Sequence, residues 1–177
     1  EFFDAANSIS IDENDILEEG KLSIIDITST AGGAEFGSVL LRDLLCKIDK
    51  AKSEGSGERP PVLIIIDEVH LFYSSGSSKE TLGSLDAICR TGRSKKMGVI
   101  FASQNPSDIP SGLKSVVNTH IYLKTDSDAV KSLGFNKTET EMLGKGYAVA
   151  AIHELSQAKV IKLPLAFAGV HNEWVIV

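Results

Sequence analysis

Two adjacent carboxylates follow the most apolar run of the sequence. Asp67 and Glu68 come directly after residues 62–66, which are all aliphatic. Ligands in open α/β sheets bind at the carboxyl ends of the strands, so a buried strand that ends in two acidic residues is typical of a nucleotide-hydrolysis site. We expect Asp67 to hold Mg²⁺, mainly through water, and Glu68 to polarise the attacking water as general base. The alternative is a pair of surface carboxylates that merely end a strand.

A polar amide follows the next apolar run. Residues 99–102 form a second predicted strand, which ends in Ser103 and Gln104. If the two strands are parallel, Gln104 lies beside Asp67 and Glu68 at the same edge of the sheet. A neutral amide there can bond a γ-phosphate oxygen and the lytic water, so it can sense an intact nucleotide. The alternative is a strand-end glutamine that caps a loop.

Between the two runs the sequence places four basic residues within residues 90–96. They lie at the end of a predicted helix, where cations complement the helix dipole. A guanidinium near a subunit edge could instead reach a neighbour's triphosphate as an arginine finger. The sequence leaves both interpretations open, and it does not choose between Arg90 and Arg93 for the second.

Hydrophobic periodicity predicts the elements that position these residues. Alternating strands and helices are expected up to residue 124, at 22–28, 36–52, 62–66, 79–91, 99–102 and 120–124. This order predicts a mainly parallel α/β sheet with right-handed crossovers, in which 62–66 is buried on both faces. Short helices near 126–133 and 138–143 and a β-hairpin of 147–152 and 159–163 follow. We expect one domain over 1–177, with its core in 20–125 and the C-terminal helices and hairpin in 126–177.

Composition excludes several classes of protein. The 177 residues are 42% hydrophobic and 24% charged, as in soluble globular proteins, and the length suits one domain. The formal net charge of −6 gives no overall basic surface for nucleic acid. No apolar run approaches the ~20 residues of a membrane-spanning helix. Cys46 and Cys89 lack metal-ligand spacing and indicate reduced thiols, so we expect a cytoplasmic protein.

The segment Asp67-Glu68-Val69-His70 also matches the DExH box of helicases that carry two motor domains in one chain. The spacing excludes that class, because its arginine motif belongs to a second domain far downstream. The strand after the box should also end in a Ser-Ala-Thr-like triplet, which is absent. For His70 we expect a packing role in its loop; the alternative is that it touches the site. For the aromatic pair Phe72-Tyr73 we expect core packing; the alternative is a pore loop that stacks on bases.

Together these motifs resemble the HerA/FtsK superfamily of ring-forming P-loop ATPases, most closely its HerA-like branch. The resemblance spans about residues 22–165 and is carried by GKLSIIDITS (20–29), IIIDEVHLF (64–72), ICRTGRSKKMGVIFASQNPSDIP (88–110) and VVNTHIYLK (116–124). It implies a RecA-like P-loop NTPase fold with ATP and Mg²⁺ as cofactors. It also implies that Asp67 binds the metal, Glu68 activates water and Gln104 senses the γ-phosphate. Arg93 or Arg90 would act across the subunit interface.

The resemblance further implies a homo-oligomeric ring, a hexamer, that acts on DNA as an ATP-driven translocase or helicase in DNA repair or processing. A nuclease is a candidate partner of such a ring. Two alternatives stay open. One is a related motor of conjugation or secretion, and the other is a non-catalytic interaction module that has lost nucleotide binding.

One motif of that class is absent from the sequence. A phosphate-binding P-loop needs G-x-x-x-x-G-K-[ST]. The sequence has only two Gly-Lys pairs, at 20–21 and 144–145, and neither is followed by Ser or Thr. We therefore expect the P-loop upstream of Glu1, so that this chain is the C-terminal part of a motor domain with the Walker B and sensor half of the site. Alone, it is expected to be inactive as an ATPase.

Overall fold

The computed structural model describes residues 16–26, 33–54, 59–72, 78–124, 128–131, 133–153, 155 and 157–164. The chain forms two compact units, Glu1–Val116 and Val117–Val177, and each is described by itself. In the described part of the chain, no helix combines the length and the apolar character that a membrane crossing requires.

A parallel strand pair forms the centre of the first unit. β1 (Val62–Ile66) pairs with β2 (Met97–Phe101), with Val62 opposite Met97 and Ile66 opposite Phe101. The connection between them contains the short 3-10 helix η1 (Val69–Phe72) and the helix α3 (Ser78–Thr91). Because the strands are parallel and in register, their carboxyl ends meet at one edge. The predicted parallel α/β arrangement is confirmed for these two strands.

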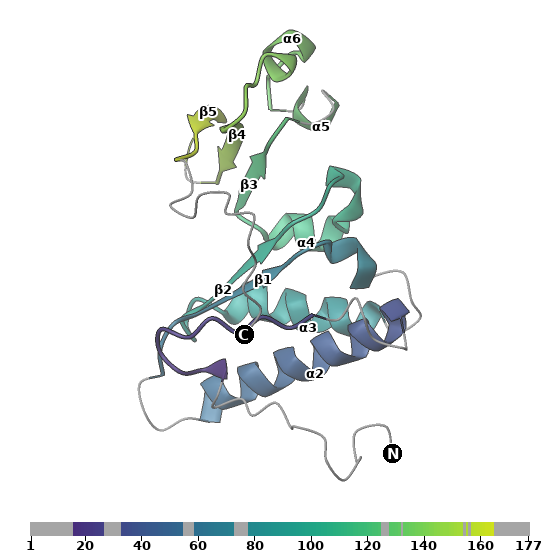
Figure 1. The fold of residues 1–177 in the computed structure, drawn as a ribbon, viewed down its shortest axis with the longest axis vertical. Helices are drawn as coiled ribbons and strands as arrows, with labels where there is room; N and C mark the ends of the chain where they lie inside the picture. The colour runs from purple at the N-terminus through teal and green to yellow at the C-terminus, as the bar shows by residue number, and fades with distance from the viewer. Residues whose placement is uncertain are drawn as a thin grey trace, which may run out of the picture. The chain divides into compact units, whose positions relative to one another are not determined.

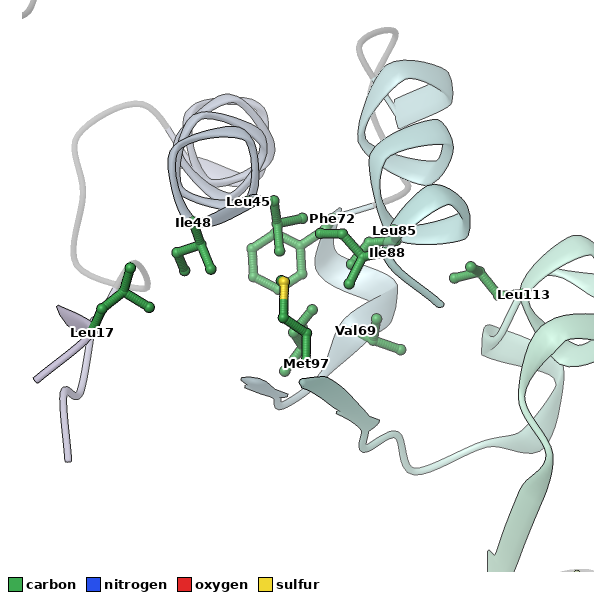
Figure 2. Close-up of a cluster of buried hydrophobic side chains, with 10 residues drawn as sticks. Leu17, Leu45, Ile48, Val69, Phe72, Leu85, Ile88, Met97 and Leu113 are labelled. Carbon is green, nitrogen blue, oxygen red and sulfur yellow. The ribbon is translucent and has the colours of Figure 1, made fainter. Parts of the chain in front are cut away.

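Two helices cover one face of this strand pair. α2 (Gly33–Glu54) and α3 run side by side beneath β1 and β2 (Figure 1). Their apolar residues recur at helical spacing and therefore form one buried stripe on each helix. Figure 2 shows the side chains of α2 and α3 directed toward Phe72 and Met97. The core cluster consists of Leu17, Leu45, Ile48, Ile66, Val69, Phe72, Leu85, Ile88, Met97 and Leu113.

On the opposite face of the strand pair, large apolar side chains are exposed. The side chains of Leu63 and Ile65 are 59% and 63% exposed, and Ile100 of β2 is also exposed. Successive side chains of a strand point to opposite faces, so α2 and α3 bury only one half of β1. The expectation that residues 62–66 are buried on both faces is wrong among the residues that the structure describes.

The strand expected over residues 22–28 is not found in its described part. Residues 22–26 have no regular structure, and Leu22 and Ile24 are 81% and 84% exposed. Within the described sheets, β1 pairs only with β2. β-branched residues favour a strand only where a neighbouring edge is available for pairing, so this run alone did not determine a strand. Residues 27 and 28 lie outside the described residues.

Two short helices complete the first unit after β2. These are η2 (Pro106–Asp108) and α4 (Ser111–Val116), and α4 contributes Leu113 to the core. The segment between β2 and α4 starts at the edge where Asp67 and Glu68 lie.

The second unit is an antiparallel sheet in the order β3-β4-β5, formed by Thr119–Tyr122, Tyr147–Ile152 and Lys159–Lys162. The predicted hairpin of β4 and β5 is confirmed. The alternation of strands and helices placed β3 in the parallel sheet, but β3 pairs antiparallel with β4. Local periodicity identifies a strand without identifying its partner, which explains this error. β3 thus belongs to the second unit, although the expected core extended to residue 125.

Two short helices, α5 (Asp128–Lys131) and α6 (Lys137–Glu141), lie between β3 and β4. α5 falls within the expected range of 126–133, and α6 overlaps the expected range of 138–143 but starts one residue earlier. At the start of α6, the Asn136 amide donates to Glu139 Oε2, and the Glu139 amide donates to Asn136 Oδ1, both at 2.9 Å. This reciprocal capping explains why so short a helix begins at this position.

Candidate active site

The carboxyl edge of β1 and β2 brings together polar residues from two strands. Asp67 and Glu68 follow β1 directly, and Ser103 and Gln104 follow β2. Gln104 Nε2 donates a hydrogen bond of 2.6 Å to Glu68 Oε1. The predicted juxtaposition of Gln104 with the acidic pair is therefore confirmed. The catalytic roles assigned to these residues stay predictions.

Glu68 has an unusual backbone conformation. Its φ of +46° lies in the left-handed region, which non-glycine residues rarely adopt. Three hydrogen bonds hold this turn. Asp67 Oδ1 accepts from the Glu68 amide at 2.9 Å, Glu68 O accepts from the Leu71 amide at 2.9 Å, and the Val69 amide donates to Ala102 O at 3.1 Å. Such conformations cost about 1–3 kcal/mol and gather at functional sites, so this strain supports a functional role for the turn.

The two carboxylate oxygens of Glu68 have different surroundings. Oε1 accepts the Gln104 amide. Oε2 is shielded from solvent, has no hydrogen-bond partner among the described residues, and lies 3.3 Å from Nδ1 of His70. A carboxylate offers about four lone-pair positions, so Oε1 keeps acceptor capacity for a water molecule beside the Gln104 amide.

Asp108 approaches the same histidine from the other strand. Its Oδ2 lies 3.7 Å from His70 Nδ1 and accepts hydrogen bonds from Ser103 Oγ at 2.8 Å and from the Asn105 amide at 3.3 Å. The Ser103 bond lowers the pKa of Asp108, and the Asn105 amide and nearby His70 lower it further. Asp108 is therefore ionised at neutral pH.

Asp108 was not among the residues expected at the site. For His70, packing of its loop was expected and contact with the site was the alternative, and the structure places Nδ1 3.3 Å from Glu68 Oε2. A sequence signal for Asp108 did exist. Asn105 and Asp108 stand three residues apart around a proline, a spacing typical of a capped helix start. That spacing predicts a turn that returns Asp108 toward the end of β2.

Asp67 is exposed, and its Oδ1 is bonded to the next backbone amide. The described residues include no group of three or more His, Cys, Asp or Glu side chains that could hold a metal. A single carboxylate still fits Mg²⁺, because this ion keeps several waters and takes most of its other ligands from phosphates. The residues present therefore suit a nucleotide-bound magnesium and not a metal held by protein ligands alone.

The two candidate arginines lie at the other end of the strands. α3 ends at Thr91, and Gly92 O accepts from the Met97 amide at 2.7 Å, beside the first residues of both strands. The structure therefore does not bring Arg90 or Arg93 together with Glu68 of the same chain. Both arginines are exposed.

The contacts of the basic residues differ. Arg90 Nε bonds to Asp86 Oδ2 at 2.8 Å within α3, which raises the pKa of the guanidinium. Lys95 forms an ion pair with Asp49 of α2. The side chain of Arg93 makes no hydrogen bond or ion pair with the residues that the structure describes. Arg93 is thus the candidate whose guanidinium is available to another molecule.

The aromatic pair that could form a pore loop is only half described. Phe72 is buried in the core, as expected from its packing role. Tyr73 and residues 74–77 lie outside the described residues.

A parallel βαβ unit with an acidic pair and an amide at its carboxyl edge has the architecture of the P-loop NTPase class. Solved structures of that fold are similar to this chain. The genome packaging NTPase B204 from Sulfolobus turreted icosahedral virus 2, in complex with AMPPCP, has a TM-score of 0.58 at 15% identity, over 89% of this chain and 73% of that one. The cytoplasmic domain of the Type VII secretion ATPase EccC from Thermomonospora curvata has a TM-score of 0.50 at 20% identity, over 76% of this chain and 17% of that one. These similarities show the fold alone.

Sequence comparison gives the family. The family described as Helicase HerA-like C-terminal matches residues 17–124, and the chain belongs to it. The DNA double-strand break repair helicase HerA of Saccharolobus solfataricus is 26% identical over 175 residues, which cover 93% of this chain and 35% of that protein. The helicase of the same name from Pyrococcus furiosus is 31% identical over 63% of this chain and 21% of its own length. The chain thus spans about a third or less of these relatives.

Proposed function

We propose that this chain supplies the water-activating half of the nucleotide site in a HerA-like, ATP-driven DNA motor. The hydrogen bond between Gln104 and Glu68 carries the proposal, because it joins a base and a phosphate-sensing amide at one strand edge. The relatives that are named DNA double-strand break repair helicases support DNA as the partner.

In this mechanism Glu68 takes a proton from the attacking water. Mg²⁺, held by Asp67 together with the nucleotide, would neutralise charge on the phosphates. The amide of Gln104 is bonded to Glu68 Oε1. The oxygens of a terminal phosphate compete for that amide, so nucleotide binding frees lone pairs of Oε1 for the proton. Gln104 thereby couples the state of the nucleotide to the state of the base.

We place Arg93 at the site of a neighbouring subunit. Its exposed side chain and its position at the strand edge opposite Glu68 support this role. In a head-to-tail assembly, one edge of each subunit contacts the opposite edge of the next subunit. Such an assembly forms a closed ring when the rotation between successive subunits adds up to a full turn. The proposed assembly is a homo-hexamer around DNA, located in the cytoplasm, with a nuclease as a further partner.

Both units of the chain belong, in this proposal, to one ATPase domain. The phosphate-binding loop comes from residues outside 1–177, because neither Gly-Lys pair of this chain has the P-loop pattern. Consequently the isolated chain does not hydrolyse ATP.

Substitution of Glu68 by Gln in the full-length protein tests the proposal. The variant keeps the shape of the side chain and removes its basicity, so ATP binds and turnover falls at least about 100-fold. Glu54→Gln on α2 is the matched control, because Glu54 is exposed and its ion pair among the described residues is a long one, 3.9 Å from Lys50. Turnover of Glu68→Gln at the rate of the control would contradict the role of Glu68.

A further inference from the structure

The imidazole of His70 lies between two carboxylates that come from different strands. Nδ1 is 3.3 Å from Oε2 of Glu68, which follows β1, and 3.7 Å from Oδ2 of Asp108, which follows β2. The ring is partly exposed, but Nδ1 itself is shielded from solvent. His70 therefore joins the loops that follow the two strands.

Two of these atoms are left without hydrogen bonds in the described part of the chain, Nδ1 of His70 and Oε2 of Glu68. A buried polar atom without a partner is unfavourable, so a small rotation of the ring that joins these two atoms stabilises the site. Carboxylates only accept hydrogen bonds. Because both neighbours of Nδ1 are carboxylates, we assign the imidazole proton to Nδ1. Catalytic hydrogen bonds are often long in ligand-free structures and tighten when the substrate binds.

Asp108 lies close to the same ring nitrogen as Glu68, with its Oδ2 3.7 Å from Nδ1 of His70. Ser103 and the Asn105 amide hold its carboxylate. The same short segment includes Gln104, which holds the other oxygen of Glu68. Oε1 of Glu68 is thus bonded to Gln104, Oε2 lies beside His70, and Asp108 provides a second carboxylate near the same ring nitrogen.

We infer that His70 is a positioning residue for Glu68. Its Nδ1–H holds Oε2 so that the carboxylate keeps one orientation when Gln104 turns from Oε1 to the nucleotide. This inference rests on the proposed function of Glu68. Loss of the donor lowers kcat for ATP about 10-fold or more, whereas the affinity for nucleotide is unchanged, because His70 acts only through Glu68.

The test compares His70→Phe with His70→Asn in the full-length protein. Phe keeps the ring and removes the donor, whereas the side-chain amide of Asn places a donor near the position of Nδ1. Steady-state ATP turnover gives kcat and KM, and a fluorescent ATP analogue gives the affinity. His153→Phe is the matched control, because His153 is exposed in the second unit and, within the described part of the chain, its side chain makes no hydrogen bond or ion pair.

The inference requires a kcat at least about 10-fold lower for His70→Phe, a KM within about twofold of the wild-type value, and substantial recovery in His70→Asn. Equal kcat values for the two variants would overturn it, as would a wild-type kcat in His70→Phe. If His70→Phe does not fold, His70→Leu replaces it, since Leu has nearly the shape of Asn and no donor. Glu68→Gln, assayed in parallel, separates the two proposals, because its full turnover would overturn the role of Glu68 itself.

Discussion

Ser38 of α2 donates a hydrogen bond of 3.0 Å from its hydroxyl to the carbonyl oxygen of Phe72, and both residues are buried. Phe72 ends η1, the turn that starts one residue after Glu68. Thr81 of α3, also buried, donates to Ser38 O at 3.3 Å. A buried polar chain therefore connects both covering helices to the turn that carries the proposed base and His70.

Substitution of Ser38 by Ala should loosen this turn. It leaves the buried Phe72 carbonyl without the Ser38 hydroxyl, which costs about 1–2 kcal/mol. We expect faster hydrogen–deuterium exchange in peptides that cover residues 69–72 of the full-length protein, because local opening free energies govern such exchange. Ser53→Ala is the control, since the Ser53 hydroxyl bonds within the exposed end of α2. Equal exchange in both variants would show that the Ser38 bond does not hold the turn.

The bond from Ser103 to Asp108 predicts a pH effect. A carboxyl group whose pKa is lowered by folding stabilises the folded state above its ordinary pKa of 3.8, and this contribution disappears as the pH falls through the lower folded value. Ser103→Ala removes the largest cause of the shift and therefore raises the pKa of Asp108 toward 3.8. We expect its acid-unfolding midpoint, followed by circular dichroism, to lie at higher pH than that of the wild-type protein.

Ser107→Ala provides the control for this titration. Ser107 lies in η2 beside Asp108, is exposed, and makes no side-chain hydrogen bond to the residues that the structure describes. Its variant should unfold at the wild-type pH. A midpoint for Ser103→Ala at or below that of Ser107→Ala would rule out the stabilising role of the Ser103 bond.

Gly92 is predicted to tolerate no side chain. A Cβ atom there would lie 2.6 Å from Ile88 O and 2.7 Å from Met97 O, both of the backbone. Gly92→Ala must move the turn between α3 and β2, at a cost of about 1–3 kcal/mol. Gly83→Ala in α3 is the matched control, because its Cβ would meet nothing within 4 Å and alanine favours helix by about 0.5–1 kcal/mol. Thermal unfolding should show a lower Tm for the first variant and an equal or higher Tm for the second.

The strand β1 and the acidic residues at its end could be predicted from the sequence, whereas the residues that surround this end could be predicted only in part. Five aliphatic residues in a row define β1, and the parallel register then places Gln104 beside Glu68. The exposure of Leu63 was not predictable, because the residues that cover a strand face are remote in sequence. Asp108 was missed because its approach to His70 depends on the turn after β2 and not on a periodic pattern.

The antiparallel pairing of β3 was missed for the same reason. Residues Thr119–Tyr122 have the composition of a strand, but their partner, β4, starts 25 positions after β3 ends, with two short helices between them. The composition of a segment indicates whether it can form a strand. Which strand it pairs with depends on contacts with residues that are remote in the sequence. The left-handed backbone of Glu68 likewise has no signal in its residue type, since glycine is the residue expected there.

The arginine finger can be tested by mixing subunits. Arg93→Ala alone should abolish ATP turnover of the full-length protein, whereas Arg90→Ala should retain most of it, since Arg90 is engaged with Asp86 in an exposed helix pair. When Arg93→Ala and Glu68→Gln subunits are mixed equally, about a quarter of the interfaces in a ring combine an intact Glu68 with an intact Arg93. Turnover should therefore return in the mixture, although each variant alone is inactive. A mixture that stays inactive while size-exclusion chromatography and mass spectrometry detect mixed rings would show that Arg93 does not act across the interface.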